Sequence, residues 1–244
     1  MTSKYVKFFV EEKELHGKYF FTGFHGVGHV GWITIRHLVT KLKAKRIGYV
    51  VSYFMQPFVT VKEGITLPYE FYKKDDIVFF VANVPMSKKD LNIVSMEVAE
   101  KIAKSEIEES ILIGGLDARL KDKEQDFRIA PTSTYYRNHE DEIKSRGYKL
   151  LEEGLGIIGP LAYFLSVFEA VKHPAVAILP YAAVERPDPK AAARAIDVIS
   201  EITGLKIDTQ ELIEEGMMIE KEIAELEKRM RESMREKETP PYYI

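Results

Sequence analysis

The sequence predicts an α/β protein with a mainly parallel sheet flanked by helices and a C-terminal helical extension. Three observations lead to this prediction. Short runs rich in Val, Ile, Phe and Tyr alternate with helical patterns, as in βα units. The 244 residues include 45% hydrophobic and 30% charged side chains, the composition of a chain that builds a core. From residue 208 onward the pattern becomes polar and strongly helical.

The order of these runs predicts the elements of the core. The predicted strands contain the β-branched and aromatic residues typical of strands that are buried on both faces. Asp188 is the expected N-cap of the last core helix, Pro189 suits its first turn, and Gly204 suits its end. We expect strands at 5–10, 19–22, 46–52, 77–82, 110–113 and 175–179, and helices at 28–43, 88–105, 140–146, 160–171 and 188–203.

The chain is expected to divide into three parts. Residues 1–204 form an α/β core domain, 205–238 a C-terminal helical extension, and 239–244 an extended tail. The net charge of −3 does not favour nucleic acid as a partner. The absence of Cys excludes disulfides and thiolate chemistry. No apolar run is long enough to span a membrane, and no leader pattern is found, so we expect a cytoplasmic protein that does not bind membranes.

The extension contains a narrow apolar seam. Its steps of four, three and four residues from Ile219 are those of a heptad, with Gly216 interrupting the pattern upstream. Such a seam fits either a terminal helix packed on its own domain or a helix that packs against another subunit. The residues of the seam are Leu212, Ile219, Ile223, Leu226 and Met230.

The last residues form a candidate binding element. Two prolines stiffen the segment that presents Tyr242, Tyr243 and Ile244. A terminal carboxylate beside a penultimate aromatic ring suits capture in a pocket of a partner protein. Docking of the tail on its own oligomer is the alternative.

A glycine-rich turn at 23–31 is the strongest candidate for a ligand site. Gly26, Gly28 and Gly31 have the GxGxxG spacing of dinucleotide sites and lie between a strand and a helix. The acid expected near the end of the next strand is missing, since that strand ends VVSY and no acid occurs before Glu63. The other interpretation is a structural turn, formed by Gly23 with these three glycines. On that interpretation, Gly26→Val would impair folding.

No catalytic or metal centre emerges from the sequence. His25, His29 and His37 lack the interleaved carboxylate of a helical zinc motif, so we expect no metal ligands. Gly114 and Gly115 follow a strong strand and offer a second turn at the sheet edge, which needs no ligand to explain it. We find no converging acid, base and nucleophile, and therefore expect no enzyme and no cofactor.

Three segments together resemble the proteasome assembly chaperone family. The stretch GFHGVGHVG at 23–31 is similar to the family's N-terminal glycine motif, and ILIGG at 111–115 and GLGIIGP at 154–160 recur in similar order. The resemblance covers residues 5–204 and implies an α/β fold. It also implies a homo-oligomer, as in archaeal members, some of which end in a hydrophobic-Tyr-any tripeptide that matches 242–244 here.

This resemblance implies a chaperone-like adaptor that binds α subunits of the proteasome core particle through its C-terminal tail. Two alternatives remain. One is an enzyme with a nucleotide or small-molecule pocket at the Gly26–Gly31 turn. The other is an oligomeric scaffold for another protein, with the tail docked internally.

Overall fold

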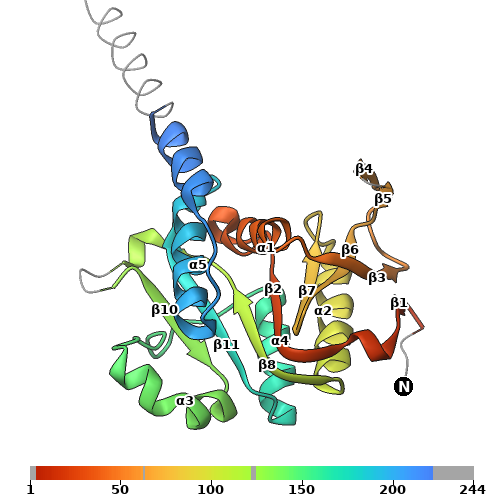
Figure 1. Cartoon of the computed structure of the whole chain (residues 1–244), viewed down its shortest axis with the longest axis horizontal. Coiled ribbons are helices and arrows are strands. Elements are labelled where there is room, and N and C mark those ends of the chain that lie inside the picture. The colour runs from red at the N-terminus through yellow and green to blue at the C-terminus, as the bar shows by residue number, and fades with distance from the viewer. Residues whose placement is uncertain (1–3, 63, 122–124, 222–244) are drawn as a thin grey trace, which may run out of the picture.

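A computed structural model describes residues 4–62, 64–121 and 125–221 of the chain. One nine-stranded sheet runs through the molecule, with helices on both of its faces (Figure 1). The strands of this sheet are β1 (Val6–Val10), β2 (His16–Gly23), β3 (Lys45–Ser52), β6 (Tyr69–Lys74), β7 (Ile77–Ala82), β8 (Glu106–Ile113), β9 (Leu116–Asp117), β10 (Phe127–Pro131) and β11 (Ala175–Ala182). The α-helices are α1 (Val30–Lys41), α2 (Lys88–Ala103), α3 (Ser133–Ser145), α4 (Pro160–Val171) and α5 (Pro189–Thr203).

The predicted fold class is confirmed. The strand order is β1-β3-β6-β7-β2-β8-β11-β10, with β9 beside β11. The central strands β7, β2, β8 and β11 are parallel, whereas β1, β3, β6 and β10 join the sheet through antiparallel pairs. The carboxyl ends of the four central strands therefore meet at one edge of the sheet.

Alternating residues of the central strands supply two cores, one on each side of the sheet. Phe21, Phe79 and Ile111 face the core beneath α1, α3 and α5. Their neighbours Phe20 and Phe80 face the opposite core, beneath α2 and α4. The continuous apolar runs of the sequence therefore belong to strands that are covered on both faces, as expected.

The helix boundaries follow local chemistry. The Asp188 side chain accepts a hydrogen bond from the Ala191 N–H, and Gly204 ends α5 at φ 75°, so both expected signals are confirmed. Helix α3 begins at Ser133, earlier than the predicted start at 140, because the Thr132 hydroxyl caps it by accepting from the Tyr135 N–H. Among the described residues, no helix combines the length and apolar character that crossing a bilayer requires.

Strands β6, β9 and β10 and a separate hairpin have no counterpart among the strands predicted from the sequence. Strands β6 and β10 extend the sheet, and a separate hairpin of β4 (Thr60–Lys62) and β5 (Gly64–Thr66) projects from the end that carries β3 (Figure 1). The fully buried Glu70 carboxylate fixes the base of this hairpin. It accepts hydrogen bonds from Arg46 and from the Leu67 N–H, and Arg46 also donates to the Ile65 carbonyl at 2.7 Å.

Candidate functional site

The predicted glycine turn connects β2 to α1 at the carboxyl edge of the parallel strands. Gly23 ends β2, and Gly31 lies in the first turn of α1. A Cβ atom added at Gly23 would lie 2.6 Å from the Gly31 carbonyl oxygen, and one added at Gly31 would overlap the Ile113 carbonyl oxygen. The two glycines therefore let α1 pack directly on the backbones of β2 and β8.

Gly28 links this turn to the loop before α5. Its φ of 59° is a left-handed conformation that favours glycine, and an added Cβ would lie 2.7 Å from the Ala182 side chain. The Asp188 N–H donates to the Gly28 carbonyl oxygen at 2.9 Å. The segments that follow β2 and β11 are thus joined by a backbone hydrogen bond.

Gly26 differs from the other three glycines. It is exposed, has φ −126°, and no atom lies within 4 Å of a Cβ built there. The structure therefore does not support the expectation that Gly26→Val impairs folding. The tight packing falls on Gly23, Gly28 and Gly31 instead.

The second turn, at Gly114 and Gly115, closes the same edge. A Cβ added at Gly115 would overlap the Val27 carbonyl oxygen, and one added at Gly114 would lie 2.6 Å from the Leu161 side chain. In a dinucleotide site, the backbone at this place must leave room for a pyrophosphate at the helix N-terminus. Here the turn after β2 packs onto the turn after β8, so chain atoms occupy the space between them.

The arrangement of β3 explains the missing ribose-binding acid. In a dinucleotide fold, the strand after the first helix lies beside the first strand, so its end reaches the ligand. Here β3 pairs with β1 and β6 and is separated from β2 by β6 and β7. Its last residue, Ser52, is buried and donates a hydrogen bond to Asp90. Neither the Ser52 nor the Asp90 side chain indicates a nucleotide-binding site.

The three histidines of the turn and α1 do not converge. The His25 ring lies 5.6 Å from that of His29 and 4.8 Å from that of Trp32. Burial, with the nearby charges of His29 and Arg36, lowers the pKa of His25 to about 4. His37 instead contacts the Asp208 carbonyl oxygen through Nε2 at 2.7 Å. Within the described ranges, no group of three or more His, Asp and Glu side chains could hold a metal ion.

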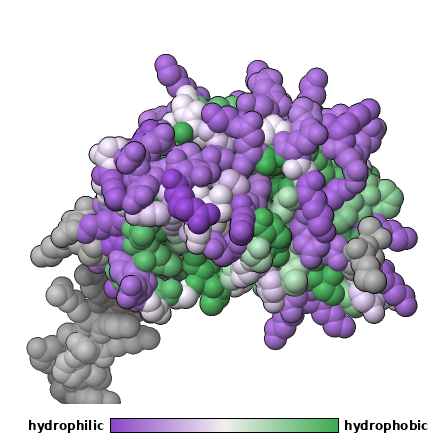
Figure 2. All heavy atoms as spheres, turned by 90° about the horizontal axis from the view of Figure 1, so that it is seen from below, coloured by the Kyte–Doolittle hydropathy of each residue, from purple (hydrophilic) through white to green (hydrophobic). Residues whose placement is uncertain are grey.

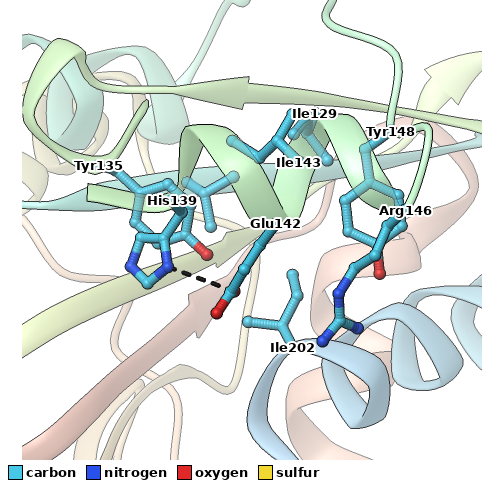
Figure 3. A pocket seen from close by; sticks show the side chains of 9 residues that line it. Ile129, Tyr135, His139, Glu142, Ile143, Arg146, Tyr148 and Ile202 are labelled. Atoms are coloured by element: carbon cyan, nitrogen blue, oxygen red, sulfur yellow. Dashed lines mark ion pairs between the residues drawn. The ribbon is translucent and has the colours of Figure 1, made fainter. Parts of the chain in front are cut away.

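A small cavity beside α3 is lined by several titratable side chains (Figure 3). Its volume of about 10 Å³ is room for one water molecule and for no substrate. His139 lies at a kink of α3, with Nε2 2.6 Å from Glu109 of β8 and Nδ1 3.4 Å from Glu142. The spacing of three residues between His139 and Glu142 predicts that they lie on the same side of a helix. No sequence signal places Glu109 beside them.

A wider groove of about 490 Å³ lies beside β10. It runs between the end of β10, the first turns of α3 and the segment at 150–151, which bridges to β10 through Ile129. Its walls are mainly apolar, and Arg137 is its charged lining residue. The groove lacks the acid, base and nucleophile set that catalysis requires.

The C-terminal extension packs on its own domain for as far as it is described. Residues 210–221 are helical, and Leu212 is buried in the core beneath α1 and α5. Lys41 pairs with Glu211 at 2.8 Å, and Lys190 pairs with Glu220 at 2.5 Å. Leu212 thus belongs to the chain's own core, whereas Ile219 is half-buried. The remaining predicted residues lie outside the described ones: Ile223, Leu226, Met230, Tyr242, Tyr243 and Ile244.

Comparisons with known proteins agree with this fold. PbaA of Pyrococcus furiosus, described as an archaeal homolog of proteasome-assembly chaperone, matches with a TM-score of 0.79 and 28% identity over 96% of this chain and 97% of PbaA. PbaB of the same organism, an archaeal proteasome activator, shares the fold with a TM-score of 0.74 and 22% identity over 92% of this chain and 100% of PbaB.

A curated relative covers nearly the same length. An uncharacterized protein of Methanocaldococcus jannaschii is 23% identical over 229 residues, 91% of this chain and 90% of that protein. The PAC2 family matches residues 20–227. The matched range begins within β2 and includes both glycine turns, every later strand and the described part of the C-terminal helix. The resemblance to proteasome assembly chaperones is therefore confirmed, and the chain belongs to the PAC2 family.

Proposed function

We propose that this protein is a homo-oligomeric adaptor of the proteasome-assembly-chaperone type, which binds α subunits of the proteasome core particle in the cytoplasm. The observation that carries the proposal is the likeness to PbaA over nearly the whole of both chains. Membership of the PAC2 family supports the same class of function. Family membership and fold support the general class of an assembly factor. The partner, the tail mechanism and the oligomer are our proposals.

The glycine turns support a role other than small-molecule chemistry. At the edge where α/β enzymes bind ligands, the turn at 23–31 packs against Gly115, Ala182 and Asp188. An enzyme would need room for its substrate at this edge. We therefore favour protein binding over the alternative of a nucleotide or small-molecule enzyme at the Gly26–Gly31 turn.

We place the partner contact in the C-terminal tail. Tyr243 would bury its ring and direct its hydroxyl to a partner group, Tyr242 would supply the hydrophobic position, and the Ile244 carboxylate would meet a lysine or backbone amides. A single short tail binds weakly. Several tails on one oligomer would bind a ring of α subunits far more tightly, because the first docking raises the effective concentration of the rest.

We also propose the division into a core domain at 1–204, a helical extension at 205–238 and a tail at 239–244. In this arrangement the seam from Ile219 onward contacts a neighbouring subunit. Leu212 holds the start of the extension to its own domain, where it is buried beneath α1 and α5. The alternative of an internal scaffold predicts that the tail is covered within the oligomer and binds nothing outside it.

Surface plasmon resonance against immobilised proteasome α rings tests the proposal. We expect the wild type to bind and Tyr243→Ala to lose nearly all binding, because the ring and its hydroxyl are removed together. One residue added after Ile244 should be almost as damaging, since it displaces the carboxylate. Lys228→Ala is the matched control in the charged part of the extension and should change little.

The outcomes separate the three interpretations. Equal binding by the wild type and Tyr243→Ala would refute the tail mechanism. If no variant binds and the tail resists carboxypeptidase in the native oligomer, the scaffold alternative replaces the proposal. Saturable binding of NAD, NADP or ATP with micromolar affinity in calorimetric titrations would favour the enzyme.

A further inference from the structure

The hairpin of β4 and β5 projects from the sheet and carries an uncovered apolar face. Val61 and Ile65 lie directly opposite each other on the two strands, so both side chains point to the same face. Val61 is 80% exposed and Ile65 is 50% exposed. A two-stranded hairpin is only marginally stable alone in water, so a surface that covers this face would stabilise it.

The segment that leads into the hairpin has the same character. Tyr53, Phe58 and Val59 are also exposed. We call residues 53–62 and 64–66 the arm. Its residues 53–61 and 64–66 include no charged side chain, although 30% of the residues in the whole chain are charged. Exposed apolar side chains and a lack of charge are typical of the centre of a protein interface.

A buried network holds the base of the arm in one orientation. The fully buried Glu70 carboxylate accepts hydrogen bonds from Arg46 and from the Leu67 N–H. It also accepts one from the Tyr72 hydroxyl at 2.6 Å. Arg46 in turn donates to the Ile65 carbonyl oxygen within the arm. Because the arm is already ordered, docking it on a partner costs less conformational entropy.

The groove beside β10 offers a second apolar surface. Its volume of about 490 Å³ lies in the range of pockets that enclose a ligand, and it has room for several side chains. Leu150 is exposed on its wall, and Ile129 is buried behind it. Pro131 lies opposite Val176 near the start of β11, so the groove lies toward the amino ends of the parallel strands. Seen from below, this side of the molecule shows hydrophobic surface between hydrophilic groups (Figure 2).

The lining of the groove favours an uncharged occupant. Arg137 is exposed and donates to the Thr134 hydroxyl of its own helix, so its head group stays in water when the apolar wall is covered. A charged segment laid along the wall would bury its charges against apolar side chains, whereas the arm brings none. The other lining residues are Ile129, Ala130, Pro131, Ser133, Tyr136, Leu150 and Leu151.

The arm and the groove lie at opposite ends of one molecule. The strand order places β3 and β6, which flank the arm, toward one end of the sheet and β10 at the other. In Figure 1, β4 and β5 project at the upper right, whereas β10 and α3 lie at the left. An arm can therefore reach a groove only on another copy. Such head-to-tail contacts link each copy to the next, and they close into a ring when the rotation between copies allows it.

We propose that the arm of one copy of this chain docks in the β10 groove of the next copy, with Val61 and Ile65 packed against Leu150 and Leu151. This inference rests on the homo-oligomeric part of the proposed function and names a contact that is separate from the C-terminal seam. It accounts for an apolar arm that the buried Glu70 network positions but that its own domain leaves uncovered.

Cysteine cross-linking tests the contact directly, because the natural chain has no Cys. Two separately tagged full-length chains, one with Val61→Cys and one with Leu150→Cys, are mixed, allowed to exchange subunits and treated with a short bismaleimide. We expect a species that carries both tags on a denaturing gel. The matched control replaces Leu150→Cys by Ile158→Cys. Ile158 is 89% exposed on a second uncharged segment, the loop before α4, and we expect no doubly tagged species from this pair.

Light scattering measures the effect on the native mass. Val61→Asp and Leu150→Asp should each shift the mass toward that of a single chain, because each places a charge in the apolar contact. Their circular dichroism spectra should stay unchanged, since both side chains are exposed. A chain with both Val61→Asp and Leu150→Lys should recover part of the mass, because opposite charges then meet between copies. Ile158→Asp should leave the mass unchanged.

Amide hydrogen exchange gives a readout that a local effect would not produce. Exchange in β4 and β5 should be slower in the wild type than in Leu150→Asp. The substituted residue lies at the other end of its own chain, so it can change exchange in the arm only through a neighbouring copy. Equal exchange in the arm of the two proteins would contradict the contact.

Failure of this inference is distinguishable from failure of the proposed function. An oligomeric wild type whose mass is unchanged by both Val61→Asp and Leu150→Asp would refute the arm contact alone. Equal cross-linking by the control pair would refute the groove as the docking site. A monomeric wild type would overturn the inference together with the homo-oligomer, whether or not it binds α rings. A confirmed arm contact without α-ring binding would remove the proteasome partner alone.

Discussion

Replacing Gly31 by alanine tests whether the glycine turn is a packing device. The new Cβ would overlap the Ile113 carbonyl oxygen and lie 2.7 Å from the Phe24 backbone nitrogen. Both are backbone atoms of the core, so neither can move aside as the end of a flexible side chain can. The only relief is to push α1 away from β2 and β8, which loosens the core beneath the helix.

The cost can be estimated from overpacking in other proteins. Forcing one extra carbon into a packed core costs about 1 to 3 kcal/mol, and a clash with backbone atoms lies at the upper end of that range. We therefore expect Gly31→Ala to lower the free energy of unfolding by about 3 kcal/mol. For a chain of this size, that corresponds to a fall in melting temperature of about 6 to 12 °C.

Urea denaturation followed by circular dichroism measures the change, with Gly26→Ala as the matched control. Gly26 is exposed and has nothing within 4 Å of the new atom, so its variant should stay within about 0.5 kcal/mol of the wild type. Equal stability of Gly31→Ala and the wild type would refute the packing argument. A large loss in Gly26→Ala would show that the open side of the turn contacts something the argument omits.

Two further predictions concern buried polar groups. Burial lowers the pKa of His173 to about 4 from its ordinary 6.5, so the unfolded chain binds more protons between these values and stability falls as pH falls through 6.5 toward 4. His173→Gln should remove about 3 kcal/mol of the acid-induced loss, measured as the difference between urea unfolding at pH 7 and pH 4, and an unchanged pH dependence would contradict this. Glu70→Gln should cost about 2 to 3 kcal/mol, because it leaves the part-buried Arg46 without its anion. Amide hydrogen exchange in β5 should rise with it, since Arg46 also binds the Ile65 carbonyl, and unchanged exchange there would argue against that link.

Much of the fold could be read from the sequence because it depends on local signals. Buried parallel strands require continuous runs of β-branched and aromatic residues, and these runs mark β7, β8 and β11. The start and end of α5 follow from one side-chain hydrogen bond at Asp188 and one left-handed residue at Gly204. The order of the glycine motifs also indicated the family, because a tight turn is determined by a few consecutive residues.

The pairing of the strands, and every feature that depends on this pairing, could be known only from the tertiary structure. Strand β3 follows α1 in the chain yet pairs far from β2, and this placement, rather than the missing acid alone, separates its end from the glycine turn. Spacing made Gly26, Gly28 and Gly31 look equivalent, but only the approach of β8 and β11 shows which of them are constrained. Likewise, Glu109 meets His139 across 30 residues of sequence. Sequence periodicity reports which residues are buried; the neighbours that bury them are set by long-range pairing, which no local pattern encodes.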